Sequence, residues 1–166
     1  YLDEIASLGL GTREIGFTGG EPFMNPDIVA MLEDALSRGH EVLVLTNAMQ
    51  PLQRPRVKAG LLALRQRYGE RLQIRVSLDH YSRALHEAER GDGTWERTLA
   101  GLDWLAAEGF RIAIAGRTCW GEAMENERRG YAALIAERGW PIDAADPAAL
   151  VLLPEMDVKA EVPEIS

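Results

Sequence analysis

The chain has 166 residues and a formal net charge of −8, with 46% hydrophobic and 27% charged residues. These values are typical of a globular domain long enough to bury a core, and we expect one domain over residues 1–166. The acidic balance argues against a nucleic-acid partner, because phosphates repel such a surface, and no apolar run is long enough for a membrane helix.

The cysteine content indicates the cellular compartment and excludes some kinds of site. Cys119 is the single cysteine, so the chain can form neither an internal disulfide nor a multi-cysteine metal site. This usage indicates a reducing compartment, and we expect a cytoplasmic protein with no metal ligands in these residues. The opening "YLDEIASLGL" resembles the end of an amphipathic helix, which indicates a fragment truncated before Tyr1. The ending "LPEMDVKAEVPEIS" has no closing helix and is compatible with a truncation there too.

One unit recurs along the chain: a short apolar run, a loop, an amphipathic helix and a glycine. The first helix is predicted to begin with Asn25 as its cap and Pro26 as its first residue. The prolines in residues 50–56 predict a connection without regular structure. Strands that alternate with helices predict a parallel sheet with right-handed crossovers. The predicted strands are residues 14–18, 41–46, 73–78, 111–116 and 149–153.

Several predicted strands have one large apolar side and one small or polar side. The large side chains must pack on the helices, so the other set must line a roomy, partly wet cavity. A closed eight-stranded barrel fills its middle with branched apolar residues, so the pattern favours an open or partial barrel. For Arg75 a simpler interpretation is an ion pair with a buried acid such as Glu14 or Glu41. The small and polar set is Gly16, Thr18, Arg75, Ser77, Asp79, Ala113, Ala115 and Arg117.

The segment "FTGGEP" joins the first strand to the first helix. Gly19 and Gly20 lack a Cβ, so a ligand can approach their backbone closely. Glu21 adds a carboxylate at the end of the strand, and Pro22 stiffens the corner. Carbonyl and carboxylate oxygens only accept hydrogen bonds, so this corner suits an ammonium group better than a phosphate.

The segment "FTGGEPFMNPDI" resembles the radical S-adenosylmethionine (radical SAM) enzymes, as do "LTNA", "VSLD" and "AGRT" at the ends of the next strands. The resemblance extends from about residue 3 to about residue 153. It implies an α/β fold, a partial (β/α) barrel of parallel strands, from which this chain would lack the first strand.

The resemblance also implies roles for residues at the strand ends. Gly19, Gly20 and Glu21, with Pro22, would bind the amino group of SAM. Ser77, with Asp79 as a nearby candidate, would contact the ribose, and Arg117 would hold the carboxylate. Thr46 and Asn47 would line the site, and the backbone from Cys119 to Gly121 would lie near the adenine.

The chain departs from the family at its defining feature. The CxxxCxxC loop that holds a [4Fe–4S] cluster is absent, and Cys119 alone cannot replace it. The resemblance therefore implies that the cluster ligands precede Tyr1 in the full-length protein and that this fragment is inactive alone.

For that full-length protein the resemblance implies reductive cleavage of SAM at the cluster. The resulting 5′-deoxyadenosyl radical would abstract hydrogen from an unidentified small-molecule or peptide substrate. The electron donor would be a protein such as flavodoxin or ferredoxin.

Two other functions stay open at this point. One is a non-catalytic SAM-binding or scaffold barrel, and the other is a conventional (β/α)-barrel lyase or isomerase that uses carboxylates such as Glu21 and Asp79. No catalytic residue is identified. His80 and Tyr81 either line the substrate mouth or belong to a plain loop, and His86 is assigned to a loop that leads to a Thr94 cap. The tryptophans Trp95, Trp104 and Trp140 are interpreted as packing residues.

Overall fold

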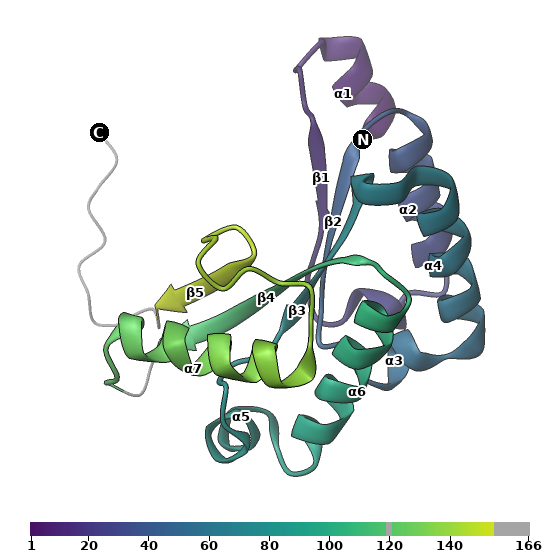
Figure 1. The fold of residues 1–166 in the computed structure, drawn as a ribbon. Coiled ribbons are helices and arrows are strands. Elements are labelled where there is room, and N and C mark those ends of the chain that lie inside the picture. Colours follow the sequence, from purple (N-terminus) through teal and green to yellow (C-terminus); the bar gives the residue numbers. More distant parts are fainter. Residues whose placement is uncertain (119–120, 155–166) are drawn as a thin grey trace, which may run out of the picture.

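The computed structural model describes residues 1–118 and 121–154. Its five strands are all parallel and lie side by side in chain order, β1-β2-β3-β4-β5. Successive strands are rotated relative to one another, so the sheet curls into a half-barrel (Figure 1). This confirms the predicted partial barrel. The strands are β1 (Glu14–Phe17), β2 (Glu41–Thr46), β3 (Leu72–Ser77), β4 (Arg111–Thr118) and β5 (Leu150–Pro154).

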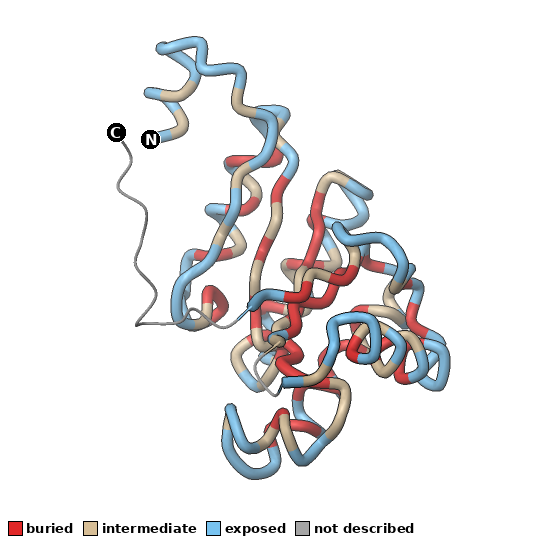
Figure 2. Tube along the Cα trace, turned by 90° about the vertical axis from the view of Figure 1, so that its left-hand side faces the viewer, coloured by how far each residue is buried: buried red, intermediate tan, exposed pale blue. Residues whose placement is uncertain are grey.

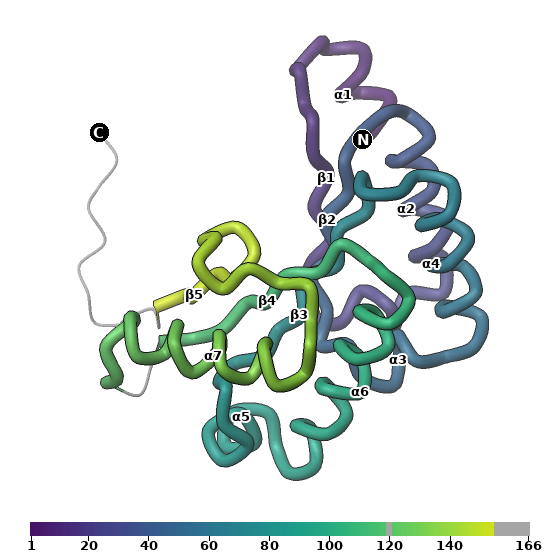
Figure 3. The backbone as a smooth tube through the Cα atoms, in the orientation of Figure 1, coloured from purple at the N-terminus to yellow at the C-terminus, as the bar shows by residue number. Residues whose placement is uncertain are grey.

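Helices follow the strands in the order expected for repeated β-α units. The four longest, α2, α4, α6 and α7, pack along the outer face of the sheet (Figures 1 and 3). Along the parts of the chain that are described, no helix is long and apolar enough to cross a membrane. The helices are α1 (Leu2–Leu8), η1 (Pro22–Met24), α2 (Ile28–Ser37), α3 (Gln50–Gln53), α4 (Pro55–Tyr68), η2 (Gly69–Arg71), α5 (Arg83–Arg90), α6 (Thr94–Ala107) and α7 (Met124–Arg138).

The core lies between the outer face of the sheet and these helices (Figure 2). Alternate residues of the strands point into it, as the period of two requires, and the apolar stripes of the helices meet them. On α2, for example, Leu32 and Leu36 are fully buried, whereas Met31 is exposed. Trp95 and Trp140 are buried, as expected of packing residues. The strand contribution is mainly Val42, Val44, Leu72, Ile74, Val76, Ile112, Ile114 and Leu150.

The opposite, concave face carries the small and polar side chains that the sequence predicts there. Gly16, Arg75 and Ala115 line a shallow hollow on this face. The same hollow has larger apolar walls than expected, because β2 contributes Leu43 and Leu45, and β5 contributes Val151 and Leu153. The concave face is therefore a cavity with a mixed lining rather than a uniformly polar one.

Three local predictions are wrong. Residues 50–56 are not an irregular connection, because α3 and the start of α4 occupy them, with each proline in the first turn, where its missing N–H is tolerated. The first helix begins at Ile28 rather than Pro26, because Asn25 Oδ1 accepts from the Asp27 N–H in a turn outside the helix. His86 lies within α5 and not in a loop.

The interpretation of Arg75 as one half of a buried ion pair is also wrong. Its Nη2 donates to the Ala148 carbonyl at 3.3 Å, and its Nε is buried without a hydrogen-bond partner. Glu41 instead lies 3.9 Å from Arg111, and Glu14 is exposed. The register explains this, since Glu14 and Glu41 pair with each other at the start of their strands, away from Arg75.

Candidate functional site

Two consecutive glycines form the corner that follows β1. Gly19 has a φ of 95° and Gly20 a φ of 25°, both in the positive region that side chains rarely adopt. No atom outside the neighbouring residues would lie within 4 Å of a Cβ at either position, so the surroundings are open. The chain therefore presents bare backbone here, as the sequence predicts.

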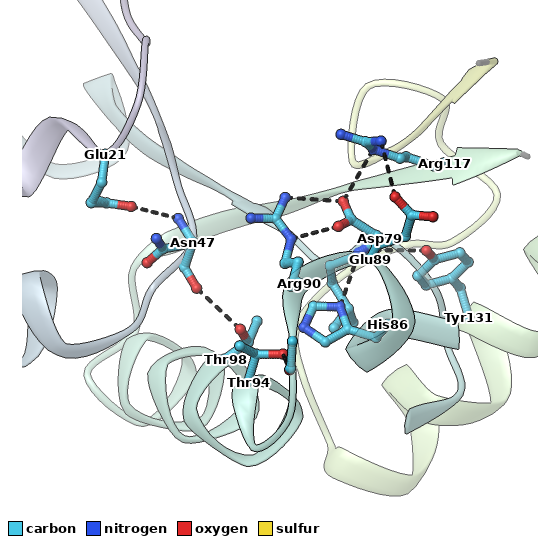
Figure 4. Close-up of polar contacts among 12 residues, drawn as sticks. Glu21, Asn47, Asp79, His86, Glu89, Arg90, Thr94, Thr98, Arg117 and Tyr131 are labelled. Atoms are coloured by element: carbon cyan, nitrogen blue, oxygen red, sulfur yellow. Dashed lines mark hydrogen bonds and ion pairs between the residues drawn. The ribbon is translucent and has the colours of Figure 1, made fainter. Parts of the chain in front are cut away.

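Glu21 fastens this corner to the end of β2. Its Oε1 accepts from Thr46 Oγ1 at 2.8 Å and from the Phe23 N–H at 3.2 Å. Its Oε2 accepts from the Asn47 N–H at 2.8 Å (Figure 4). A carboxylate has about four acceptor positions, so one more donor can still bind. The three contacts fix the direction in which that position points.

Helix α6 also contacts the end of β2. Ala48 is the single non-glycine residue with a positive φ, 57°, among those that the structure describes. The Asn47 carbonyl before it accepts from Thr98 Oγ1 of α6 at 3.2 Å. Gly101 of α6 packs so closely that a Cβ there would lie 2.2 Å from the Ala48 carbonyl oxygen. Helix α6 thus supports the strand end that supports Glu21.

A hollow of about 170 Å³ opens between these corners at the carboxyl ends of the strands. This edge of a parallel sheet is where α/β proteins build their sites. Its lining combines backbone acceptors, hydroxyl groups, an amide and one guanidinium. The residues are Thr18, Gly19, Gly20, Leu45, Thr46, Asn47, Ser77 and Arg90.

Arg90 is held by the carboxylate that follows β3. Its Nε lies 2.5 Å from Asp79 Oδ2 and its Nη2 lies 3.0 Å from Asp79 Oδ1, a two-pronged contact (Figure 4). The Asp79 side chain is 4% exposed and that of Arg90 is 24% exposed. Burial strengthens the attraction because little water screens it. The free edge of the guanidinium is thereby aimed at the hollow.

His86 supports Asp79 from below. Its Nδ1 accepts from the Asp79 N–H at 3.3 Å, and its ring packs edge-on against Trp95. The side chain is fully buried, and this desolvation lowers the pKa of His86 below its ordinary 6.5. The neutral ring with its proton on Nε2 is therefore the form that fits.

The structure distributes the predicted site residues unevenly. The hollow includes Thr46, Asn47 and Ser77 with the two glycines, whereas Arg117 does not line it. The Arg117 guanidinium, half-exposed, lies 3.5 Å from Asp79 and 3.4 Å from Glu89. Asp79 faces the two guanidinium groups and does not line the hollow, whereas Ser77 does. Of the segment predicted near the adenine, Cys119 and Trp120 lie outside the described residues.

Arg90 was missed by sequence reasoning. It is separated from Asp79 by a loop and a helix, so no short spacing links the two. The available signal was the run "RALHEAER", whose alanine, leucine, glutamate and arginine residues favour a helix. Such a helix would have placed Arg90 near the end of β3.

A second cluster of titratable groups surrounds the start of α7. Tyr81 donates to Glu122 at 3.1 Å, and His80 Nε2 lies 3.7 Å from the same carboxylate. Glu127 is fully buried, and both its oxygens are without a hydrogen-bond partner. Burial raises the pKa of Glu127 and lowers that of His80. Nowhere in the described ranges do three His, Cys, Asp or Glu side chains gather so as to hold a metal ion.

A comparison with protein families identifies the fold and the corner together. The model of the Radical SAM superfamily matches residues 1–122, which include the Gly-Gly-Glu-Pro corner, β2, β3 and Arg90. The chain belongs to the radical SAM superfamily. Its relatives are enzymes, and the half-barrel described above fits that membership.

Curated relatives of this radical SAM chain have several activities. GTP 3′,8-cyclase of Caulobacter vibrioides is 39% identical over 120 residues, covering 68% of this chain and 32% of that protein. AdoMet-dependent heme synthase of Methanosarcina barkeri is 30% identical over 115 residues, covering 69% and 30%. Mycofactocin maturase MftC of Mycobacterium ulcerans is 30% identical over 112 residues, covering 68% and 28%. The radical SAM chain spans about a third of the length of these relatives.

Solved structures share the radical SAM fold at low sequence identity. SuiB of Streptococcus suis bound to S-adenosylmethionine matches with a TM-score of 0.60 and 12% identity, covering 90% of this chain and 31% of that chain. Archaeal TYW1 matches with a TM-score of 0.52 and 18% identity, covering 77% and 40%. At these identities the likeness concerns the fold alone.

Proposed function

We propose that this chain carries the SAM-binding part of a radical SAM enzyme. The observation that carries the proposal is the hollow at the strand ends, where a glycine corner fastened by Glu21 faces the guanidinium of Arg90. The amino acid part of SAM has an ammonium group and a carboxylate. One side of the hollow offers backbone acceptors at the glycine corner, which Glu21 fastens, and the other side offers the Arg90 guanidinium.

The residues present fit SAM group by group. The Gly19 and Gly20 backbone and the remaining acceptor position of Glu21 suit the ammonium group. Arg90, held by Asp79, suits the carboxylate, a role that the resemblance gave to Arg117. The Ser77 hydroxyl and the Asn47 side chain suit the ribose hydroxyls. When bound and reduced at an iron–sulfur cluster, SAM supplies the radical that removes a hydrogen atom from a substrate.

The chain does not fit the cluster itself. A [4Fe–4S] cluster of this type needs three thiolates, and the sequence has one cysteine. We propose that the cluster ligands lie in a part of the natural protein that precedes Tyr1. The contribution of these residues is then to bind and orient SAM and to keep water from it.

The binding proposal is tested by calorimetric titration of the intact protein with SAM, prepared without oxygen. Glu21→Ala removes the carboxylate that holds the corner, and we expect the dissociation constant to rise at least tenfold, about 1.4 kcal/mol. Glu33→Ala is the matched control, because this partly exposed carboxylate on α2 lies away from the hollow and forms an ion pair with Arg67. Unchanged affinity in Glu21→Ala, or no SAM binding by the intact protein, would contradict the assignment.

The cluster and the reaction need separate measurements on the intact protein. We expect about four irons per chain after reconstitution, and release of 5′-deoxyadenosine from SAM when a reductant is added. A protein that binds SAM without iron would instead be a non-catalytic SAM-binding module. The proposed partners are a small-molecule or peptide substrate and an electron donor such as flavodoxin or ferredoxin, in the cytoplasm.

A further inference from the structure

Arg75 is a positive charge on the concave face with no acid to balance it. Among the described residues no Asp or Glu oxygen lies within ion-pair distance of it, and its contact is to the Ala148 carbonyl at 3.3 Å. Its Nε is buried and unpartnered. A partly buried guanidinium without a carboxylate is uncommon, because burying a charge is unfavourable unless it is paired.

The neighbours of Arg75 leave space beside it. In the sheet register Arg75 lies between Leu45 of β2 and Ala113 of β4. Its side chain reaches past β4 towards the residues before β5, where it meets Ala148. The alanines of β4 and Gly16 of β1 have little bulk. The guanidinium is therefore accessible from the hollow on the concave face.

The walls of this hollow are apolar. Leu43 and Leu45 stand on one side, and Val151 and Leu153 on the other. Among the residues that the structure describes, Arg75 is the single charged one in this lining. A ligand that satisfies both the walls and the cation has an apolar body and one anionic group.

The position of Arg75 along β3 places this hollow next to the SAM site. Ser77, which lines that site, comes two residues later on the same face of β3, and two strand residues span about 6.6 Å. A molecule anchored at Arg75 and lying along the apolar walls would present its far carbons below the SAM hollow. A substrate attacked by a SAM-derived radical must lie there.

We propose that Arg75 is a specificity residue that binds the carboxylate of an apolar substrate in the half-barrel. The inference rests on the proposed function, because a substrate implies an enzyme. The binding of a carboxylate to Arg75 can nevertheless be measured whether or not SAM binds. A carboxylate fits better than a di- or triphosphate, because one guanidinium balances one negative charge and the described residues of the lining include no second cation. Arg90 lines the SAM hollow, where it is proposed to bind the carboxylate of SAM.

The test uses 4-phenylbutyrate as the probe and 4-phenylbutanamide as its neutral match. The intact protein is labelled with ¹⁵N-arginine, and the Nε–H signal of Arg75 is identified by its loss in Arg75→Lys. We expect this signal to shift progressively with the carboxylate and to stay in place with the amide. The titration itself is carried out on the unmodified protein, and the Arg75→Lys variant serves only to identify the signal.

Variants give the second arm of the test. Arg75→Gln should weaken 4-phenylbutyrate binding at least tenfold in calorimetry. The control is Arg111→Gln, which removes an arginine beside Glu41 at the start of β4 and should leave this binding unchanged. Equal binding of acid and amide, or unchanged affinity in Arg75→Gln, would overturn the proposal. Inorganic phosphate binding in place of the carboxylate would overturn the choice of ligand.

The two proposals fail separately. SAM affinity is measured on the same samples, and we expect Arg75→Gln to bind SAM as well as the unmodified protein does. If SAM does not bind the unmodified protein, the proposed function is wrong. If SAM binds and the Arg75 signal ignores 4-phenylbutyrate, only the substrate inference is wrong.

Discussion

The Asn47 N–H donates to Oε2 of Glu21 at 2.8 Å, and this contact joins the end of β2 to the glycine corner after β1. The two residues are 26 positions apart, so the bond fixes the relative position of two separate loops. Because Thr98 holds the carbonyl of the same Asn47, the corner, the strand end and α6 form one connected unit.

The first prediction concerns the charge of Glu21. Glu21→Gln replaces one accepting oxygen with an NH₂ group. In either orientation of the amide this NH₂ group must face a donor: the Asn47 N–H, or the Thr46 hydroxyl and the Phe23 N–H. We expect a loss of about 1–3 kcal/mol in the free energy of unfolding, from urea denaturation. Glu33→Gln, at a partly exposed position of α2, should change it by less than about 0.5 kcal/mol. Equal losses in both would show that the three contacts of Glu21 do not matter.

The second prediction concerns the contact between α6 and the Ala48 corner. Gly101→Ala would normally stabilise a helix by about 1 kcal/mol, because alanine has the higher helix propensity. Here the added methyl group would lie 2.2 Å from the Ala48 carbonyl oxygen, so the backbone must move. We expect the melting temperature to fall and SAM binding to weaken with it. A rise in melting temperature would mean that α6 does not press on the corner.

The third prediction concerns the pair formed by Asp79 and Arg90. Arg90→Gln leaves a buried carboxylate with the more distant Arg117 alone, and we expect a loss of about 3 kcal/mol in unfolding free energy. In Asp79→Asn with Arg90→Gln, neither charge remains, so the double variant should be more stable than the sum of the two single losses. Strict additivity of the losses would contradict a direct pair.

The fourth prediction is a pH dependence that arises at Glu127. Burial raises its pKa above the ordinary 4.5, so the folded protein keeps a proton that the unfolded chain releases. Stability from this group is complete below pH 4.5 and falls as pH rises through the folded pKa. Glu127→Gln has no such proton to lose, so this decrease in stability should be absent from the variant. The difference in unfolding free energy between the variant and the unmodified protein should therefore grow with pH.

The control for this pH profile is Glu125→Gln in the same turn, since Glu125 is exposed. That variant should follow the unmodified protein from pH 4.5 to pH 8 when unfolding is measured by urea titration. A difference between Glu127→Gln and the unmodified protein that stays constant with pH would show that Glu127 has an ordinary pKa.

The sequence predicted the strands and most helix faces because these depend on local periodicity. The Gly-Gly-Glu-Pro corner was also predictable, since the glycines and Pro22 have backbone reasons to be there and Glu21 supplies a carboxylate. Helix α5 was not, because its one buried residue is the polar His86 and the usual apolar stripe is missing. Arg90 was lost with that helix.

Other errors came from contacts between distant residues. The charge of Arg75 predicted a buried acidic partner, but the register places Glu14 and Glu41 opposite each other and away from it. Arg117 was expected after the strand but lies within β4, one residue before its end. Its side chain pairs with Glu89 on α5, which the pattern of the strand could not predict. The alternation of residues along a strand predicts the face of the sheet on which a side chain lies. It does not predict the position of the charged group at the tip of a long side chain.

The outer edges of β1 and β5 have a practical consequence. Within the described ranges each of these strands is paired on one side only, so each leaves a row of backbone N–H and C=O groups free. Such rows readily accept another strand, from a second molecule as well as from the same one. Preparations of these residues alone should therefore tend to oligomerise, and a short strand-forming peptide that caps β1 should keep them monomeric.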